Sequence, residues 1–171
     1  MKIFLTVLFL FFSVASSVSA SEKDMEILGT YGDWTAYMFQ NEKGKICYMA
    51  TEPIKSEGKY KKRDDVFLFV THHPDENSYD VVNVMAGYTY KSTSKPIFQI
   101  DKNKSVNFKI YKDTSWATDE KMGKNLVSQM KKGSKAVLKG TSQRGTLTTD
   151  TFSLIGFSKA YRDIQKACGR E

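Results

Sequence analysis

The sequence has only two cysteines and two histidines, and no long apolar run beyond its first residues. After residue 20, nothing approaches the about 18 consecutive apolar residues that a membrane-spanning helix needs. We therefore expect a mature chain that is soluble or, at most, peripherally attached to a membrane. Neither cysteine has a histidine or another cysteine at ligand spacing, which argues against a zinc site. Internal repeats, low-complexity tracts and an interdomain linker are also missing.

The first twenty residues have the features of a secretory signal peptide. Lys2 supplies the positive charge, residues 3–12 are apolar but too few to span a bilayer, and residues 18–20 offer the small side chains of a cleavage site. Ser21, and not a cysteine, follows the expected cleavage point, so we expect no lipoprotein anchor. The sequence thus predicts a signal peptide at residues 1–20 and one domain at residues 21–171, exported to the periplasm, the outer membrane or the outside of the cell.

Basic residues outnumber acidic ones, and the formal net charge is +7. This excess favours adhesion to acidic surfaces, although it also suits a solvated surface that keeps an exported protein in solution. An aromatic residue, Tyr60, interrupts the densest basic cluster, and acidic residues lie on both sides of it. Because exported proteins seldom meet nucleic acid, we expect an anionic envelope or host-surface partner and no nucleic acid. The candidate contacts in this cluster are Lys59, Lys61, Lys62 and Arg63.

Alternating runs of β-branched and aromatic residues indicate a mainly β domain. Residues 52–65 are rich in proline, glycine and charge and read as an exposed loop. A change of period predicts two short helices, at about residues 119–132 and 157–168. The simplest architecture is an antiparallel β-sandwich. We expect about eight strands, at residues 31–39, 45–51, 66–71, 80–86, 96–100, 106–111, 135–140 and 146–154.

Both tryptophans and one arginine, Arg144, are candidates for surface contacts. Trp34 lies in an alternating strand, where an aromatic of this size is usually buried. Trp116 falls in a predicted short loop before the first helix and is the better candidate for a partly exposed contact. Arg144 precedes Gly145 in a turn between two strands, where turn formation is the first role and ligand contact the second.

His72 and His73 are the residues that decide whether the sequence favours an enzyme. Adjacent residues of a strand point to opposite faces, so the two rings cannot easily share a metal ion. A catalytic role would require a distant nucleophile to approach one of them. We interpret the pair as the end of a hairpin and predict no catalytic residue, no metal site and no cofactor. The alternative is a periplasmic hydrolase or metal-dependent enzyme that uses His72 or His73.

Cys47 and Cys168 can form one disulfide bond. An exported chain meets an oxidising compartment, where a single pair of cysteines is expected to bridge. The bond would join an early strand to the last helix. Two free, buried thiols are the alternative.

Several motifs occur in one order along nearly the whole mature chain. They are GDW at 32–34, KICY at 45–48, FLFVT at 67–71, AGY at 86–88, DTSWA at 113–117, KGTSQRG at 139–145, TTDTFSL at 148–154, GF at 156–157 and AC at 167–168. In this order they resemble the invasion-associated locus B family of exported alphaproteobacterial proteins.

The resemblance implies an immunoglobulin-like β-sandwich in the periplasm or outer membrane and supports the Cys47–Cys168 pairing. It brings no catalytic residues with it. It also implies a non-enzymatic envelope protein that acts by surface binding, with a role in host-cell interaction or virulence where the bacterium lives with a host. An envelope assembly or stability factor is a further alternative.

Overall fold

The structure is a computed structural model that describes residues 25–42 and 44–170. The expected signal peptide therefore lies outside the described residues. The α-helices are α1 (Glu120–Met130) and α2 (Phe157–Ala167), and one 3-10 turn, η1, spans Pro74–Glu76. The strands are β1 (Met25–Tyr31), β2 (Trp34–Asn41), β3 (Gly44–Thr51), β4 (Lys55–Gly58), β5 (Phe67–His73), β6 (Ser78–Met85), β7 (Ile97–Ile100), β8 (Val106–Asn107), β9 (Lys109–Tyr111), β10 (Thr114–Trp116), β11 (Lys135–Thr141) and β12 (Leu147–Ser153).

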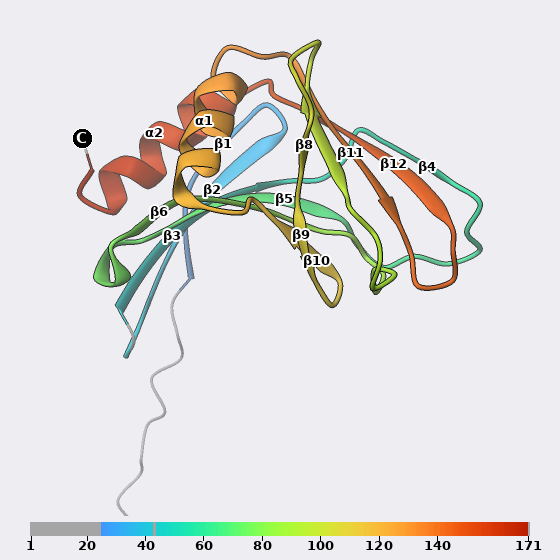
Figure 1. Ribbon diagram of the computed structural model, residues 1–171. Helices are drawn as coiled ribbons and strands as arrows, with labels where there is room; N and C mark the ends of the chain where they lie inside the picture. The colour runs from blue at the N-terminus through green and yellow to red at the C-terminus, as the bar shows by residue number, and fades with distance from the viewer. Residues whose placement is uncertain (1–24, 43, 171) are drawn as a thin grey trace, which may run out of the picture.

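The strands form two antiparallel sheets (Figure 1). The first has seven strands in the order β1-β2-β3-β5-β6-β10-β9, and the second has five in the order β4-β12-β11-β7-β8. Figure 1 shows the two helices over one end of the seven-stranded sheet and the five-stranded sheet beside its other end. This arrangement confirms the predicted mainly β, sandwich-like fold with two helices.

A single core joins the two sheets and the helices. The seven-stranded sheet contributes Trp34, Met49, Leu68 and Val84, all with fully buried side chains. They meet buried residues of the other elements, namely Phe98 (β7), Leu126 (α1), Leu138 (β11), Phe152 (β12), Phe157 and Ile164 (α2). Strand alternation explains the pattern, because every second residue of a strand points to the same face. Trp34 therefore lies in the core, as predicted.

Both predicted helices are present within one or two residues of the expected bounds. Asp119 caps α1, because its side chain accepts a hydrogen bond of 2.8 Å from the backbone N–H of Met122. Gly156 precedes α2 with a φ of 93°, a conformation that favours glycine. The first residue of α2, Phe157, packs edge to face on Trp34 with a ring separation of 5.0 Å. In the described part of the chain, no helix has the length and apolarity to cross a membrane.

The cysteines form the expected disulfide bond. Cys47 on β3 and Cys168, directly after α2, are bonded with a Cα–Cα distance of 6.0 Å. The bond spans 121 residues of sequence and holds the end of α2 on the seven-stranded sheet. The alternative of two free thiols is therefore wrong.

Three strands lie where the sequence predicted none. β1 precedes the first predicted strand, β4 lies in the predicted loop at residues 52–65, and β10 replaces the predicted loop around Trp116. The run at 106–111 is also divided into β8 and β9, which belong to different sheets. These strands are short or largely exposed, so their strand structure depends on pairing with distant partners.

Candidate functional site

The strongest candidate for a binding site is a pocket of about 590 Å³ that three separate segments build. The loop between β4 and β5 forms one wall, residues 87–89 after β6 form the back, and the β11–β12 turn with the start of β12 forms the opposite wall. We call it the basic pocket. Its lining residues are Lys59, Tyr60, Lys61, Lys62, Arg63, Asp64, Gly87, Tyr88, Thr89, Ser142, Gln143, Arg144, Thr146 and Thr148.

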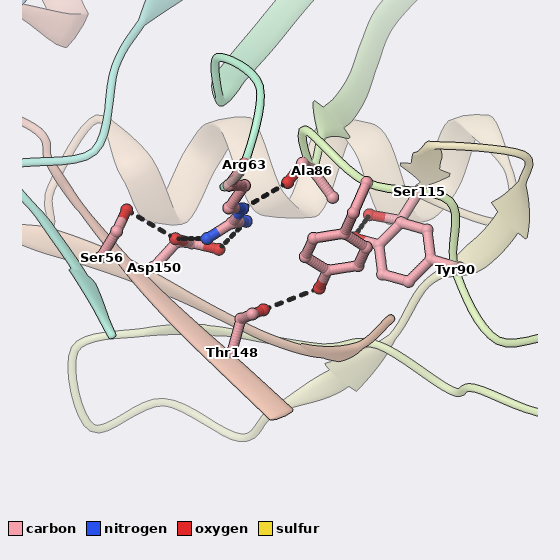
Figure 2. A network of polar contacts seen from close by, with 8 residues as sticks. Ser56, Arg63, Ala86, Tyr90, Ser115, Thr148 and Asp150 are labelled. Atoms are coloured by element: carbon pink, nitrogen blue, oxygen red, sulfur yellow. Dashed lines mark hydrogen bonds and ion pairs between the residues drawn. The ribbon is translucent and has the colours of Figure 1, made fainter. Parts of the chain in front are cut away.

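Arg63 is one of the lining residues, and a network of polar contacts fixes its side chain (Figure 2). Its two terminal nitrogens donate to the two carboxylate oxygens of Asp150, each at 2.7 Å, and its Nε donates to the carbonyl oxygen of Ala86 at 2.7 Å. The side chains of Arg63 and Asp150 are only 5% and 0% exposed. Ser56 Oγ donates a further hydrogen bond of 2.7 Å to Asp150. The guanidinium thus links β12 of one sheet to the end of β6 in the other.

The charge of Arg63 is retained despite its burial. Burial by itself lowers the pKa of this side chain, but the hydrogen bonds and the negative charge of Asp150 outweigh that effect and leave the pKa above its ordinary value. The guanidinium also lies 4.8 Å from the ring centroid of Tyr88 and 5.5 Å from that of Tyr60. Because Asp150 neutralises it, Arg63 supports the pocket and adds little free positive charge.

Two tyrosines continue the network beneath the pocket. The hydroxyl of Tyr88 lies 2.7 Å from Oγ1 of Thr148, and the hydroxyl of Tyr90 donates to Oγ of Ser115 at 3.2 Å (Figure 2). Burial raises the pKa of both Tyr88 and Tyr90, so both phenols are neutral at neutral pH. The ring of Tyr88 therefore lines the pocket with its hydroxyl satisfied, and the buried ring of Tyr90 packs edge to face against it at 5.2 Å.

Close backbone packing holds the lysine-rich wall in place. The N–H of Asp64 donates to the carbonyl oxygen of Gly87 at 3.1 Å. Gly87 has a φ of 67°, and a Cβ atom there would lie 2.1 Å from the carbonyl oxygen of Asp64. Only glycine allows this approach, so the AGY motif at 86–88 serves the positioning of the loop.

Four other cations give the pocket its free charge. Lys59, Lys61 and Lys62 stand on one wall and Arg144 on the other, and all four are exposed. No described carboxylate forms an ion pair with any of them. A pocket with unpaired cations on both walls and hydroxyl and amide groups between them is suited to bind an anion.

The structure thus brings together five of the six surface contacts that the sequence suggested, and it separates the sixth. Trp116 lies on β10, half-buried, and its Nε1 donates to Thr114 Oγ1 at 2.8 Å. The expectation that Trp116 lies in a loop was wrong, because β10 pairs with both β6 and β9. Trp116 is outside the basic pocket.

Sequence reasoning overlooked Asp150 and Tyr88, although one signal for Asp150 was present. In the alternating run TTDTFSL, Asp150 shares a face with Phe152, which is the pattern of a charge that points into the core. A buried carboxylate needs a cationic partner, and the structure shows that Arg63, which the sequence suggested as a surface contact, is that partner. Nothing in the local sequence singles out Tyr88, because its contacts with Arg63 and Thr148 are tertiary.

His72 is fully buried, and it lies opposite Cys47 in the pairing of β3 with β5. Its Nδ1 accepts a hydrogen bond of 3.1 Å from the backbone N–H of Asp80, and its ring packs against Tyr79 and Tyr161. Burial lowers the pKa of His72 below the ordinary value, although the charge of Asp80 acts in the opposite direction. His73 is half-buried at the hairpin end, as expected. The described residues contain no group of three or more His, Cys, Asp or Glu placed to hold a metal ion.

Comparison with known proteins gives a family. The family model described as "Invasion associated locus B (IalB) protein" matches residues 34–165, which is more than half of the chain. The match includes every segment of the basic pocket. No curated protein and no solved structure matches the chain.

Proposed function

Because the chain belongs to the invasion associated locus B family, we propose that it is an exported, non-enzymatic protein of the cell envelope that binds an anionic envelope or host-surface component. The observation that carries this proposal is the basic pocket, where four unpaired cations surround a floor fixed by the Arg63–Asp150 pair. Binding residues commonly lie on exposed loops that a rigid scaffold holds in position.

Two features support a place outside the cytoplasm. The disulfide bond between Cys47 and Cys168 is of the kind that persists in oxidising compartments. The first twenty residues have the composition of a secretory signal peptide. A role in host-cell contact is part of the same proposal, because host glycans and bacterial lipids both present the negative charge that the pocket would bind.

A hydrolase that uses His72 or His73 has less support. The ring of His72 is fully buried, so a substrate would have no path to it. Its Nδ1 accepts from a backbone N–H and lies 4.0 Å from Oδ1 of Asp80, and its ring packs against Tyr79 and Tyr161. A general base must lie within hydrogen-bond reach of the proton that it abstracts.

The proposal is tested with vesicles and with a charge-matched control. The mature protein is titrated with vesicles of phosphatidylglycerol in phosphatidylethanolamine, and separately with heparin as a sulfated glycan. The variant Lys59→Ser/Lys61→Ser/Lys62→Ser should bind the preferred probe on the order of 100-fold more weakly, since each lysine near an anionic surface contributes about 1 kcal/mol.

The control variant Lys102→Ser/Lys104→Ser/Lys132→Ser removes the same charge from exposed positions outside the pocket. It should lose far less affinity than the pocket variant. Equal losses would mean that net charge alone drives binding, and this outcome would contradict the proposal. Failure of the wild-type protein to bind either probe would contradict it as well.

A further inference from the structure

In the described part of the chain, the seven-stranded sheet has one face that other elements cover and one face that they leave open. Its inward residues, among them Ala36, Met49, Val70 and Val82, belong to the core. Both helices and the five-stranded sheet lie against this inward side (Figure 1). None of the residues at alternate positions, such as Tyr48, is part of the core cluster.

The open face lacks charge across its five central strands. Strand register places residues that pair directly on the same face, so the outward set can be followed from strand to strand. Within these described strands, the outward residues contain no Asp, Glu, Lys or Arg, and one histidine, His73, lies among them at the end of β5. They are Thr35, Tyr37 and Phe39 (β2), Ile46, Tyr48 and Ala50 (β3), Phe67, Phe69, Thr71 and His73 (β5), Ser78, Val81, Asn83 and Met85 (β6), and Thr114 and Trp116 (β10).

The second sheet of the same molecule shows what a solvated face looks like. Its outward residues include four charged side chains and several small polar ones, as is usual for an antiparallel sheet with one face in water. They are Lys55 and Glu57 (β4), Leu147, Thr149 and Thr151 (β12), Lys135, Val137, Lys139 and Thr141 (β11), Ile97 and Gln99 (β7), and Asn107 (β8). The absence of charge from the open face is therefore specific to the seven-stranded sheet.

Aromatic rings form a continuous band over the open face. Tyr37 stacks on Tyr48 with a ring separation of 4.8 Å, Tyr48 lies 6.3 Å from Phe69, and Phe69 lies 5.7 Å from Phe67. Met25, from the edge strand β1, accepts a hydrogen bond from the Tyr48 hydroxyl at 3.1 Å and extends the band. These four rings are only half-buried, so neighbours within the sheet do not cover them.

Polar and charged groups appear at one border of this face, on the edge strand β9. Lys109 there is opposite Trp116, and Tyr111 is 66% exposed. At the other edge, Ile27 is 62% exposed, lies opposite Tyr37 and continues the apolar surface. Protein interfaces have the same composition, with aromatic residues and methionine at a charge-depleted centre and polar groups at the rim.

We propose that the open face of the seven-stranded sheet binds the same face of a second copy of this chain. Two copies related by a two-fold axis would bring their aromatic bands together without burying an unpaired charge. Face-to-face packing of two sheets, about 10 Å apart, is an arrangement that antiparallel sheets commonly adopt.

The area of the open face is close to what an interface with a second copy of this chain requires. The five central strands, at about 4.8 Å spacing and with up to three outward residues each repeating at about 6.8 Å, cover roughly 500 Å², and the two edge strands bring the face to roughly 700 Å². Each partner in a standard protein interface buries about 800 Å². The open face is therefore close to one half of a stable interface.

Sedimentation of the mature, oxidised protein at increasing concentration tests the proposal. We expect a monomer–dimer equilibrium, with Phe69→Glu weakening self-association at least tenfold because it places two carboxylates against each other at the centre of the interface. The matched control is Val137→Glu, an apolar-to-acidic change at a half-buried position on the outward face of the other sheet. It should dimerise like the wild type, and so should the triple lysine variant of the basic pocket.

Trp116 provides a second measurement that needs no substitution. Trp34 is fully buried, whereas Trp116 is half-buried on the open face. Acrylamide quenching of tryptophan fluorescence should therefore increase on dilution, as the dimer separates and Trp116 becomes accessible. A wild-type protein that stays monomeric, a dimer that Phe69→Glu leaves unchanged, quenching that does not depend on concentration, or a monomer that inserts this face into neutral lipid vesicles would each overturn the proposal.

Discussion

At the level of single side chains, Arg63 and Asp150 have the clearest structural role. One residue comes from a loop between sheets and the other from the middle of β12, and their two parallel hydrogen bonds hold the lysine-rich loop against the body of the protein. A buried pair of this kind contributes little compared with apolar residues of the same shape, but the loss of one partner leaves a buried charge unpaired. The pair therefore makes the position of the loop depend on both residues.

We predict that Asp150→Ala lowers the free energy of unfolding by about 3 to 5 kcal/mol, because it leaves the Arg63 guanidinium buried and unpaired. Urea unfolding of the oxidised protein measures this loss. Arg63→Ala/Asp150→Ala should recover part of it, which a double-mutant cycle would reveal. Glu120→Ala, which breaks the exposed pair with Lys124, is the control and should cost far less stability, because solvent screens an exposed ion pair. Similar losses for Asp150→Ala and the control would contradict the prediction.

The lowered pKa of His72 leads to a prediction of how the free energy of unfolding depends on pH. The folded state lowers the pKa of His72, so the unfolded chain takes up a proton near the ordinary value of about 6.5 while the folded protein does not. The stability that His72 contributes is present above that pH. It is lost as the pH falls from the ordinary value toward the lowered one, with a slope of up to about 1.4 kcal/mol per pH unit.

The adjacent histidine is the control for this effect. His72→Gln keeps an acceptor for the N–H of Asp80 and should remove the slope between about pH 7.5 and 5.5, whereas His73→Gln leaves His72 in place and should retain it. Urea unfolding at each pH provides the free energies. The same slope in both variants would show that other groups cause the pH dependence.

At the level of elements, α2 depends on the disulfide bond that follows it. Its buried side chains Phe157, Tyr161 and Ile164 pack on the seven-stranded sheet, and Cys168 fixes its end to β3. We predict that Cys47→Ala/Cys168→Ala folds but loses about 2 to 4 kcal/mol of stability. Amide hydrogen exchange should show the largest gain in α2, while urea unfolding measures the total. Wild-type protein that is alkylated at both cysteines without reductant would contradict the assignment.

How well an element could be predicted depended on how much of its structure is encoded locally. The two helices were recognised because their apolar residues repeat every three to four positions and Asp119 lies at the start of α1. β4 could not be recognised, because its sequence KSEG is entirely exposed and takes strand form only by pairing with β12. β10 was missed for a related reason, since its three residues are held between β6 and β9.

At the level of the whole molecule, the sequence shows which residues are basic, but it does not predict which of them line the same pocket. Lys59 and Arg144 are far apart in the chain, and only the pairing of β4, β12 and β11 brings their segments to the same pocket. The open face was equally hidden, because the alternation that marks a strand does not tell which of its two faces the rest of the chain will cover. The basic pocket and the open face involve different residues, so the two proposed interactions can be tested separately.

The long span of the disulfide bond also sets an order of events during biosynthesis. Cys47 is synthesised 121 residues before Cys168, so the thiol on β3 has no partner until synthesis of the last helix is complete. Closure of the bond therefore requires that the ribosome has passed residue 168, and a chain cut short before that point keeps Cys47 unpaired.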